Sequence, residues 1–197
     1  MAIAASGCSI GVHSSQARNA THRQTLTPEI SGGPLTGTVD ESASATELAL
    51  GILVAKSSVV VEIGAAFGLR RVGFEGATDD LTMVKTPSGR DFYDAYFTSV
   101  MVPLSTLDDV TLGVYGRLSY AGLSQLLPGD SATYGLEGGV EVNLPSVTKP
   151  NRIFMRVGVL AEGADHELEM ANGIGRALGS TSFLGLTATI GTRVMER

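Results

Sequence analysis

The sequence predicts an all-β fold: an eight-stranded antiparallel up-and-down transmembrane β-barrel with a polar, side-chain-filled interior. Three observations support this class. Successive segments alternate between apolar and small or polar residues, and short and long connections alternate between them. The composition is also rich in glycine, at 25 of 197 residues, and 43% hydrophobic. No run of about 18 apolar residues is present, so a transmembrane helix is excluded.

The alternation is clearest between residues 110 and 120. One phase is apolar, and its members are Val110, Leu112, Val114, Leu118 and Tyr120. The other phase is small, polar or charged, and its members are Thr111, Gly113, Tyr115, Arg117 and Ser119. Successive side chains of a strand point to opposite faces, so one face of this strand is apolar and the other carries glycine and an arginine. A ring of such strands would be polar inside and apolar outside.

Two regions divide the chain. Residues 1–27 are predicted to form a flexible arm, because the stretch from Ser9 to Thr27 is polar and follows neither the strand nor the helix period. Cys8 follows Ala5-Ser6-Gly7 and resembles the lipidated cysteine of a bacterial lipobox, although the segment before it is too short for a secretory signal. The region is therefore a possible truncated signal or lipobox region, and Cys8 a possible lipidation site. Residues 28–197 are predicted to form the barrel.

Eight segments of the barrel region are predicted to be strands. In chain order they are 29–39, 45–56, 59–74, 91–104, 110–122, 133–144, 152–162 and 182–194. Segment 29–39 is the weakest because Gly32, Gly33 and Pro34 interrupt it. The other segments alternate as 110–122 does, except that 91–104 has a mixed phase. There the expected outward residues are Tyr93, Phe97 and Met101, and the expected inward residues are Asp94, Tyr96 and Thr98.

Connection lengths support the hairpin arrangement independently. Short links fall at 56–58, 105–109 and 145–150, and longer or more polar links at 40–44, 75–90, 123–132 and 163–180. The two kinds alternate along the chain, which places all short turns at one end of the barrel and all long loops at the other. Tyr93, Tyr120 and Tyr134 lie near the long-loop end, where tyrosine side chains favour a membrane interface.

With these strands and loops, the chain resembles the small eight-stranded outer-membrane barrels of Gram-negative bacteria, of the OmpA transmembrane domain and OmpX type. The resemblance is architectural and covers residues 29–194. It implies a porin-like cell-envelope protein in the outer membrane of a Gram-negative bacterium, in contact with membrane lipids. We expect a monomer, and the sequence identifies no protein partner.

Four charged residues of the inward phase define the candidate site: Glu62, Arg117, Glu137 and Arg156. They are expected at similar depths, on the third, fifth, sixth and seventh predicted strands. Because an eight-stranded barrel is just wide enough to be filled by side chains, these charges must be paired. We therefore predict an internal ion-pair network that plugs the lumen. A gated ion path or proton site is the alternative role for the same residues.

No chemistry-bearing motif accompanies this network. The glycines of 173–179 have the wrong spacing for a dinucleotide fingerprint, and the acidic run from Asp165 to Glu169 with His166 is read as a solvated loop. A net charge of −6 gives no footprint for nucleic acid. We expect no catalytic residues, no metal site, no cofactor and no enzymatic activity.

The predicted function is a structural or surface-interaction role in the envelope. The sequence leaves open a lipid-modifying barrel enzyme and a narrow pore. A soluble lipocalin-like barrel that binds a ligand is less well supported, because it needs an apolar interior and a polar exterior.

Overall fold

The computed structural model describes residues 6–29, 32–56, 59–84, 89–122, 132–145, 151–172 and 174–195. These described residues form ten strands and one short 3-10 helix. The strands are β1 (Ser6–Asn19), β2 (Arg23–Pro28), β3 (Leu35–Thr38), β4 (Asp40–Lys56), β5 (Val59–Glu75), β6 (Gly89–Leu107), β7 (Val110–Gly122), β8 (Ala132–Pro145), β9 (Asn151–Glu169) and β10 (Arg176–Met195). The helix is η1 (Asp79–Met83). None of the described residues belongs to a helix long and apolar enough to cross a membrane.

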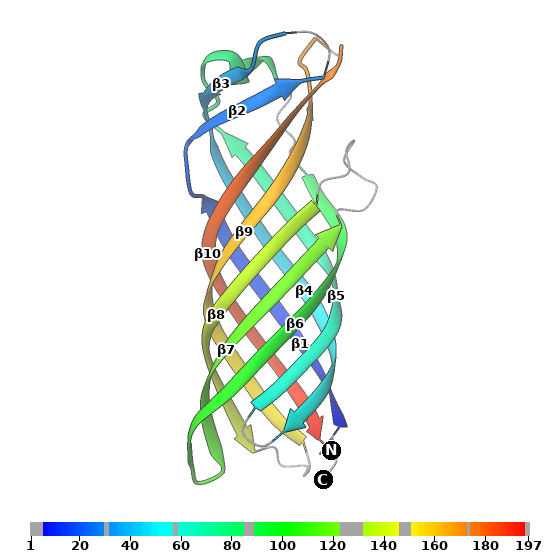
Figure 1. Ribbon diagram of the computed structural model, residues 1–197, viewed down its shortest axis with the longest axis vertical. Coiled ribbons are helices and arrows are strands. Elements are labelled where there is room, and N and C mark those ends of the chain that lie inside the picture. The colour runs from blue at the N-terminus through cyan, green and yellow to red at the C-terminus, as the bar shows by residue number, and fades with distance from the viewer. Residues whose placement is uncertain are drawn as a thin grey trace.

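Eight of the strands close into a barrel. The antiparallel order is β1-β4-β5-β6-β7-β8-β9-β10, and β10 pairs back with β1 from Gly7↔Met195 to Asn19↔Phe183. Closure removes the free edges of the sheet, so every barrel strand has two partners along its central part. Figure 1 shows the ring of tilted strands as a tall cylinder, with both chain ends at its lower rim. The predicted eight-stranded antiparallel up-and-down barrel is confirmed.

The side chains follow the predicted arrangement, with apolar residues on the outer face of the barrel and polar residues inside. On β7, for example, Leu112, Leu118 and Tyr120 are exposed on the outer face while Tyr115 and Arg117 are buried in the interior. Exposed aliphatic side chains recur on every wall; they include Ile10, Val12, Leu48, Leu50, Ile52, Ile63, Leu69, Val100, Val114, Leu136, Val140, Val157, Val159, Leu184, Leu186 and Ile190. Together these residues are called the outer belt below. Buried glutamates and arginines occupy the opposite phase, which confirms a polar interior.

The two ends of the barrel differ. The chain ends and the close approaches between β4 and β5, β6 and β7, and β8 and β9 lie at the lower end (Figure 1). The β6–β7 turn uses Asp108 and Asp109 at φ 47° and 70°, and positive φ at both central residues characterises the tight hairpin turn that follows strand twist. At the upper end β9 and β10 continue above the other strands, and β2 and β3 pair with β10 there to form an extension.

The upper extension has its own small apolar core. β2 pairs with β3 and, at Thr27 and Pro28, with β10, so the hairpin lies across the top of the barrel (Figure 1). Its core consists of Leu26, Val39, Leu81, Val84 and Ala177. The segment around η1 covers the edge of β3, where the Thr78 and Thr38 side chains and backbones are hydrogen-bonded. The extension is therefore a folded platform above the barrel.

The predicted flexible arm over residues 1–27 is wrong for the described part. Ser6–Asn19 is barrel strand β1, and Arg23–Pro28 is β2. Correspondingly, of the expected first strand 29–39 only Leu35–Thr38 is a strand, β3, and it belongs to the upper hairpin rather than to the barrel; Ile30 and Ser31 lie outside the described residues. The alternation was hidden because only Ile10 and Val12 of β1 belong to the outer belt, whereas Gln16 and Arg18 face outward above it. Residues 1–5 of the arm lie outside the described ranges.

Two expected links are also strand. Residues 40–44 begin β4, and most of 163–180 belongs to β9 and β10, which pair from Arg176↔Glu169 down to Val194↔Asn151. Polar residues such as Ser42 and Asp165 made these stretches read as loops. They are strands that continue beyond the outer belt, where an outward side chain has no need to be apolar.

The phase expected for segment 91–104 is reversed. Tyr93, Phe97 and Met101 are buried in the interior, while Tyr96 is exposed outside and Thr98 faces outward with it. Large aromatic residues occupy both phases of β6, so the size of a side chain does not show which of the two phases faces outward. Inside the barrel these rings have specific partners: the Tyr93 hydroxyl donates to Glu47, and the Arg117 guanidinium lies 4.5 Å from the centre of the Phe97 ring.

Candidate functional site: the charged interior of the barrel

Most of the buried charges among the described residues form a lower group, a central group and an upper pair. The lower group contains Glu62 on β5, Glu141 on β8, Arg156 on β9 and Arg193 on β10, all almost fully buried. Arg156 donates from Nε to Glu141 Oε2 over 2.6 Å and from Nη2 to Glu62 Oε2 over 2.9 Å. Arg193 donates from Nη2 to the same Glu141 oxygen over 3.0 Å. Two carboxylates and two guanidiniums thus balance one another.

This lower group spans the lumen. β5 and β9 stand on opposite walls, four strands apart in a ring of eight, and Arg156 reaches from β9 to Glu62 on β5. Arg193 comes from a third wall, β10, and its Nη2 lies 3.5 Å from Glu62 Oε2. The Phe154 ring packs against both guanidiniums, 5.1 Å from that of Arg156 and 4.3 Å from that of Arg193. Side chains from several walls therefore meet across the lumen.

The central group holds two carboxylates around one guanidinium. Arg117 donates from Nη2 to Glu47 Oε1 over 2.5 Å, and its Nη1 lies 3.8 Å from Glu137 Oε2. Each carboxylate has a phenol donor as well: Tyr93 for Glu47, over 2.5 Å, and Tyr115 for Glu137. Hydrogen bonds to a buried carboxylate reduce the free-energy cost of removing its charge from water. The two tyrosine hydroxyls therefore compensate for the absence of a second cation in this group.

His13 on β1 completes the central group. Its Nδ1 is 2.8 Å from Thr189 Oγ1, and its Nε2 is 3.8 Å from Glu137 Oε2. The His13 ring therefore contacts the Glu137 carboxylate from β1, a further wall of the barrel. Sequence reasoning missed His13 because it assigned β1 to a flexible arm.

The upper pair joins Arg70 on β5 to Glu162 on β9, again across the lumen. Between this pair and the central group is an enclosed cavity of about 30 Å³, lined in part by Ser15, Ser119 and Thr133. That volume holds one or two water molecules rather than a ligand or a continuous water column. The interior is therefore filled by side chains, as an eight-stranded barrel of this kind requires.

The four predicted site residues are all buried in the interior, but in two groups rather than one. Arg117 and Glu137 face each other as register partners in the central group, and Glu62 and Arg156 are paired in the lower group. They were expected at one depth because residues were counted along each strand. Because the strands are tilted and staggered, residues at equal positions along different strands lie at different heights in the barrel. The expectation of a single depth was therefore wrong.

Several members were not chosen from the sequence although their phase was visible. Glu47, Glu141 and Arg193 lie in the inward phase of their strands, and Arg70 does as well. The alternation of the sequence shows that such residues face inward. Which residues they pair with depends on which strands face each other across the lumen. Cys8 is exposed on the outer face of β1, and its lipidation stays a prediction. No group of three or more His, Cys, Asp or Glu residues suited to a metal ion is present among the described residues.

Fold and interior together define the class of protein: a closed eight-stranded antiparallel β-barrel with an apolar outer belt and an ion-paired lumen. The sequence matches no protein-family model and no curated protein. Solved structures similar to this chain include the outer membrane protease OmpT from Escherichia coli, at 12% identity and a TM-score of 0.40 over 98% of this chain and 96% of OmpT. Neisserial surface protein A is 13% identical, with a TM-score of 0.30 over 91% and 95%. The beta domain of the Bordetella autotransporter BrkA is 11% identical, with a TM-score of 0.36 over 96% and 99%.

Proposed function

We propose that the protein is an integral barrel of a Gram-negative outer membrane, non-enzymatic, with a closed lumen and a surface-contact role for its upper extension. The observation that carries the membrane assignment is the outer belt. Ile52, Val159 and Leu186, on three separate walls, are each more than 60% exposed, and the belt surrounds the barrel. A soluble monomer does not expose a continuous apolar surface of this extent, and a lipid bilayer covers it without cost.

The closed lumen follows from the interior groups. An open pore of this class would need a water-filled path lined by charges of one sign or by polar groups. Here opposite charges meet across the lumen at three heights, and the lower group alone joins β5, β8, β9 and β10. A plugged barrel is therefore the state that this interior supports.

The surface role rests on the upper extension. β2, β3, η1 and the tips of β9 and β10 are held together by the apolar core around Leu26 and Leu81. Forming this extension orders two strands beyond the eight of the barrel, which costs conformational entropy. A barrel that served only as a closed plug would not need these two strands. The extension lies at the end opposite the chain termini, where barrels of the outer membrane carry their extracellular loops.

Single-channel recording in planar bilayers tests the closed lumen. The wild-type protein is expected to give no stable conductance. Arg117→Ala is expected to stay silent too, because the lower group still closes the lumen after the central group loses its cation. Flotation of the same preparation with lipid vesicles controls for insertion. Stable, long-lived openings of the inserted wild-type protein would contradict the plug and favour the narrow pore.

A further inference from the structure

The enclosed cavity between the upper pair and the central group is lined by two buried donors that lack partners. Arg70 of the upper pair and Arg117 of the central group both line it, and their exposed fractions are only 4% and 6%. Nη2 of each arginine donates to a carboxylate. Neither Nε has a hydrogen-bond partner among the described residues. Two arginines beside the same enclosed space therefore each have one N–H group still to be satisfied.

Unpaired donors of this kind are rare in folded proteins. A buried N–H group nearly always has a partner, which is either a protein group or an ordered water molecule. Without one, the free-energy cost of removing the group from water is not compensated, and this cost is larger for a charged side chain than for a neutral one. A ligand in the cavity that accepts hydrogen bonds from both Nε atoms would remove this cost for two arginines at once.

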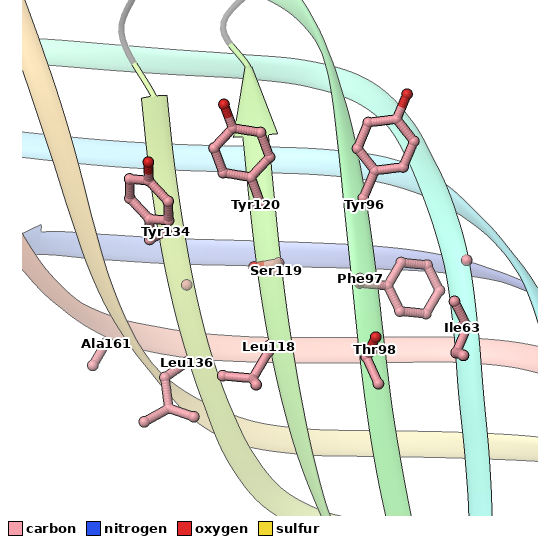
Figure 2. A pocket seen from close by; sticks show the side chains of 12 residues that line it. Ile63, Tyr96, Phe97, Thr98, Leu118, Ser119, Tyr120, Tyr134, Leu136 and Ala161 are labelled. Atoms are coloured by element: carbon pink, nitrogen blue, oxygen red, sulfur yellow. The ribbon is translucent and has the colours of Figure 1, made fainter.

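Hydroxyl groups from the inner side of the barrel wall add further polar partners. Figure 2 shows part of this wall from outside, with Leu118, Ser119 and Tyr120 consecutive on β7. Leu118 and Tyr120 are exposed on the outer face, whereas Ser119 lines the inner cavity. Thr133 on β8 lines the cavity too, and its hydroxyl accepts a hydrogen bond from Arg70 Nη1 over 3.3 Å. Because a hydroxyl group can both donate and accept, these side chains suit a small polar ligand.

Charge and size together determine which ligand fits. The carboxylates of Glu47, Glu137 and Glu162 line the cavity with the two guanidiniums. An anion would lie against these three carboxylates, and a metal cation would lie against the two N–H donors. A water molecule accepts hydrogen bonds from the N–H groups and donates to carboxylate or hydroxyl oxygens, so it suits both kinds of partner. The volume of about 30 Å³ holds one or two such molecules.

We propose that this cavity is a binding site for ordered water, which accepts hydrogen bonds from Arg70 Nε and Arg117 Nε and so joins the upper pair to the central group. The upper pair connects β5 to β9, and Arg117 connects β7 to β4 and β8. With the water bound, these five walls share one hydrogen-bonded network across the upper half of the lumen. The inference rests on the proposed closed lumen, because a closed lumen separates this water from the solvent.

Nuclear magnetic resonance of the arginine Nε–H groups tests the site in the full chain, folded in lipid nanodiscs. Bound water gives cross-peaks at the water frequency whose signs differ between laboratory-frame and rotating-frame Overhauser spectra, whereas hydrogen exchange gives the same sign in both. We expect cross-peaks from bound water at the Nε–H groups of Arg70 and Arg117. Arg193 provides the matched control, because its Nε is also buried without a partner among the described residues but does not line this cavity. Its Nε–H group should show no such cross-peak.

Ala121→Val is the variant that displaces the water. Ala121 is buried and lines the cavity, so the two added methyl groups occupy its space. Both cross-peaks should be lost in this variant. They should remain in Ala188→Val, which makes the same change at an exposed position on the outer face of β10. If Ala121→Val does not fold, the comparison of Arg70 and Arg117 with Arg193 in the wild type decides alone.

The possible results separate the water site from the closed lumen. Absence of the cross-peak at Arg70 or at Arg117 in the wild type overturns the water bridge and leaves the closed lumen standing. Retention of both cross-peaks in folded Ala121→Val does the same. Cross-peaks of equal intensity at Arg193 contradict the closed lumen as well, since they indicate water along the whole interior.

Discussion

Replacing Glu141 by alanine is expected to destabilise the barrel by about 3–5 kcal/mol, the usual cost of breaking a buried ion pair by removing one partner. Glu141 is fully buried and accepts hydrogen bonds from both Arg156 and Arg193. Among the described residues, its removal leaves Glu62 as the one carboxylate in contact with these two guanidiniums. The free energy of unfolding is measured by urea titration of the protein in lipid vesicles, with far-UV circular dichroism.

Two further variants make this result interpretable. Glu141→Gln keeps the size of the side chain and should fall between the wild type and Glu141→Ala, since a neutral amide accepts weaker hydrogen bonds than a carboxylate. Glu75→Ala removes an exposed glutamate at the upper end of β5 and should leave stability within about 0.5 kcal/mol. If Glu141→Ala unfolds at the same urea concentration as Glu75→Ala, the lower group does not stabilise the barrel.

Replacing Val140 by arginine is expected to cost about 2–4 kcal/mol in lipid vesicles, because the side chain would place a charge on the lipid-facing surface near mid-depth. Val140 is half-exposed on the outer face of β8, two rows below Leu136. A solvent-facing site would tolerate the same change within about 0.5 kcal/mol. The urea midpoint in vesicles therefore distinguishes a lipid-covered face from a water-covered one.

The control for this substitution is Ser180→Arg. Ser180 is exposed on β10 in the stretch that rises above the barrel, where it pairs with Asp165 on β9. Arginine at this position should change the midpoint little. Equal effects at both positions, large or small, would contradict the assignment of the outer belt to lipid and of the extension to water.

The period of two was enough to predict most of the barrel. On β7, alternation placed Leu112 and Leu118 outside and Arg117 inside, because each strand has to show one face to each environment. The prediction was wrong where a strand leaves the outer belt. Gln16 and Arg18 on β1 face outward above it, so the sequence there carries no apolar phase and resembles a loop.

Partner choice inside the barrel could not be predicted in the same way. Arg156 and Glu62 are far apart in sequence and meet because β5 and β9 stand on opposite walls. That relation depends on closure of the ring and on strand tilt, which no single strand encodes. Tyr93 and Phe97 show a further limit: large aromatic residues lie inside because Glu47 and Arg117 provide partners for them.

The central claim, that the outer belt lies in lipid around a closed polar interior, can be tested directly with a single introduced tryptophan. The chain contains no tryptophan, so Val140→Trp gives an unobstructed fluorescence signal. In vesicles of lipids brominated on the acyl chains, its fluorescence should be strongly quenched, whereas Leu178→Trp in the upper extension should keep its intensity. Equal quenching at the two positions, or none at Val140→Trp, would contradict a barrel that spans the membrane with this face in lipid.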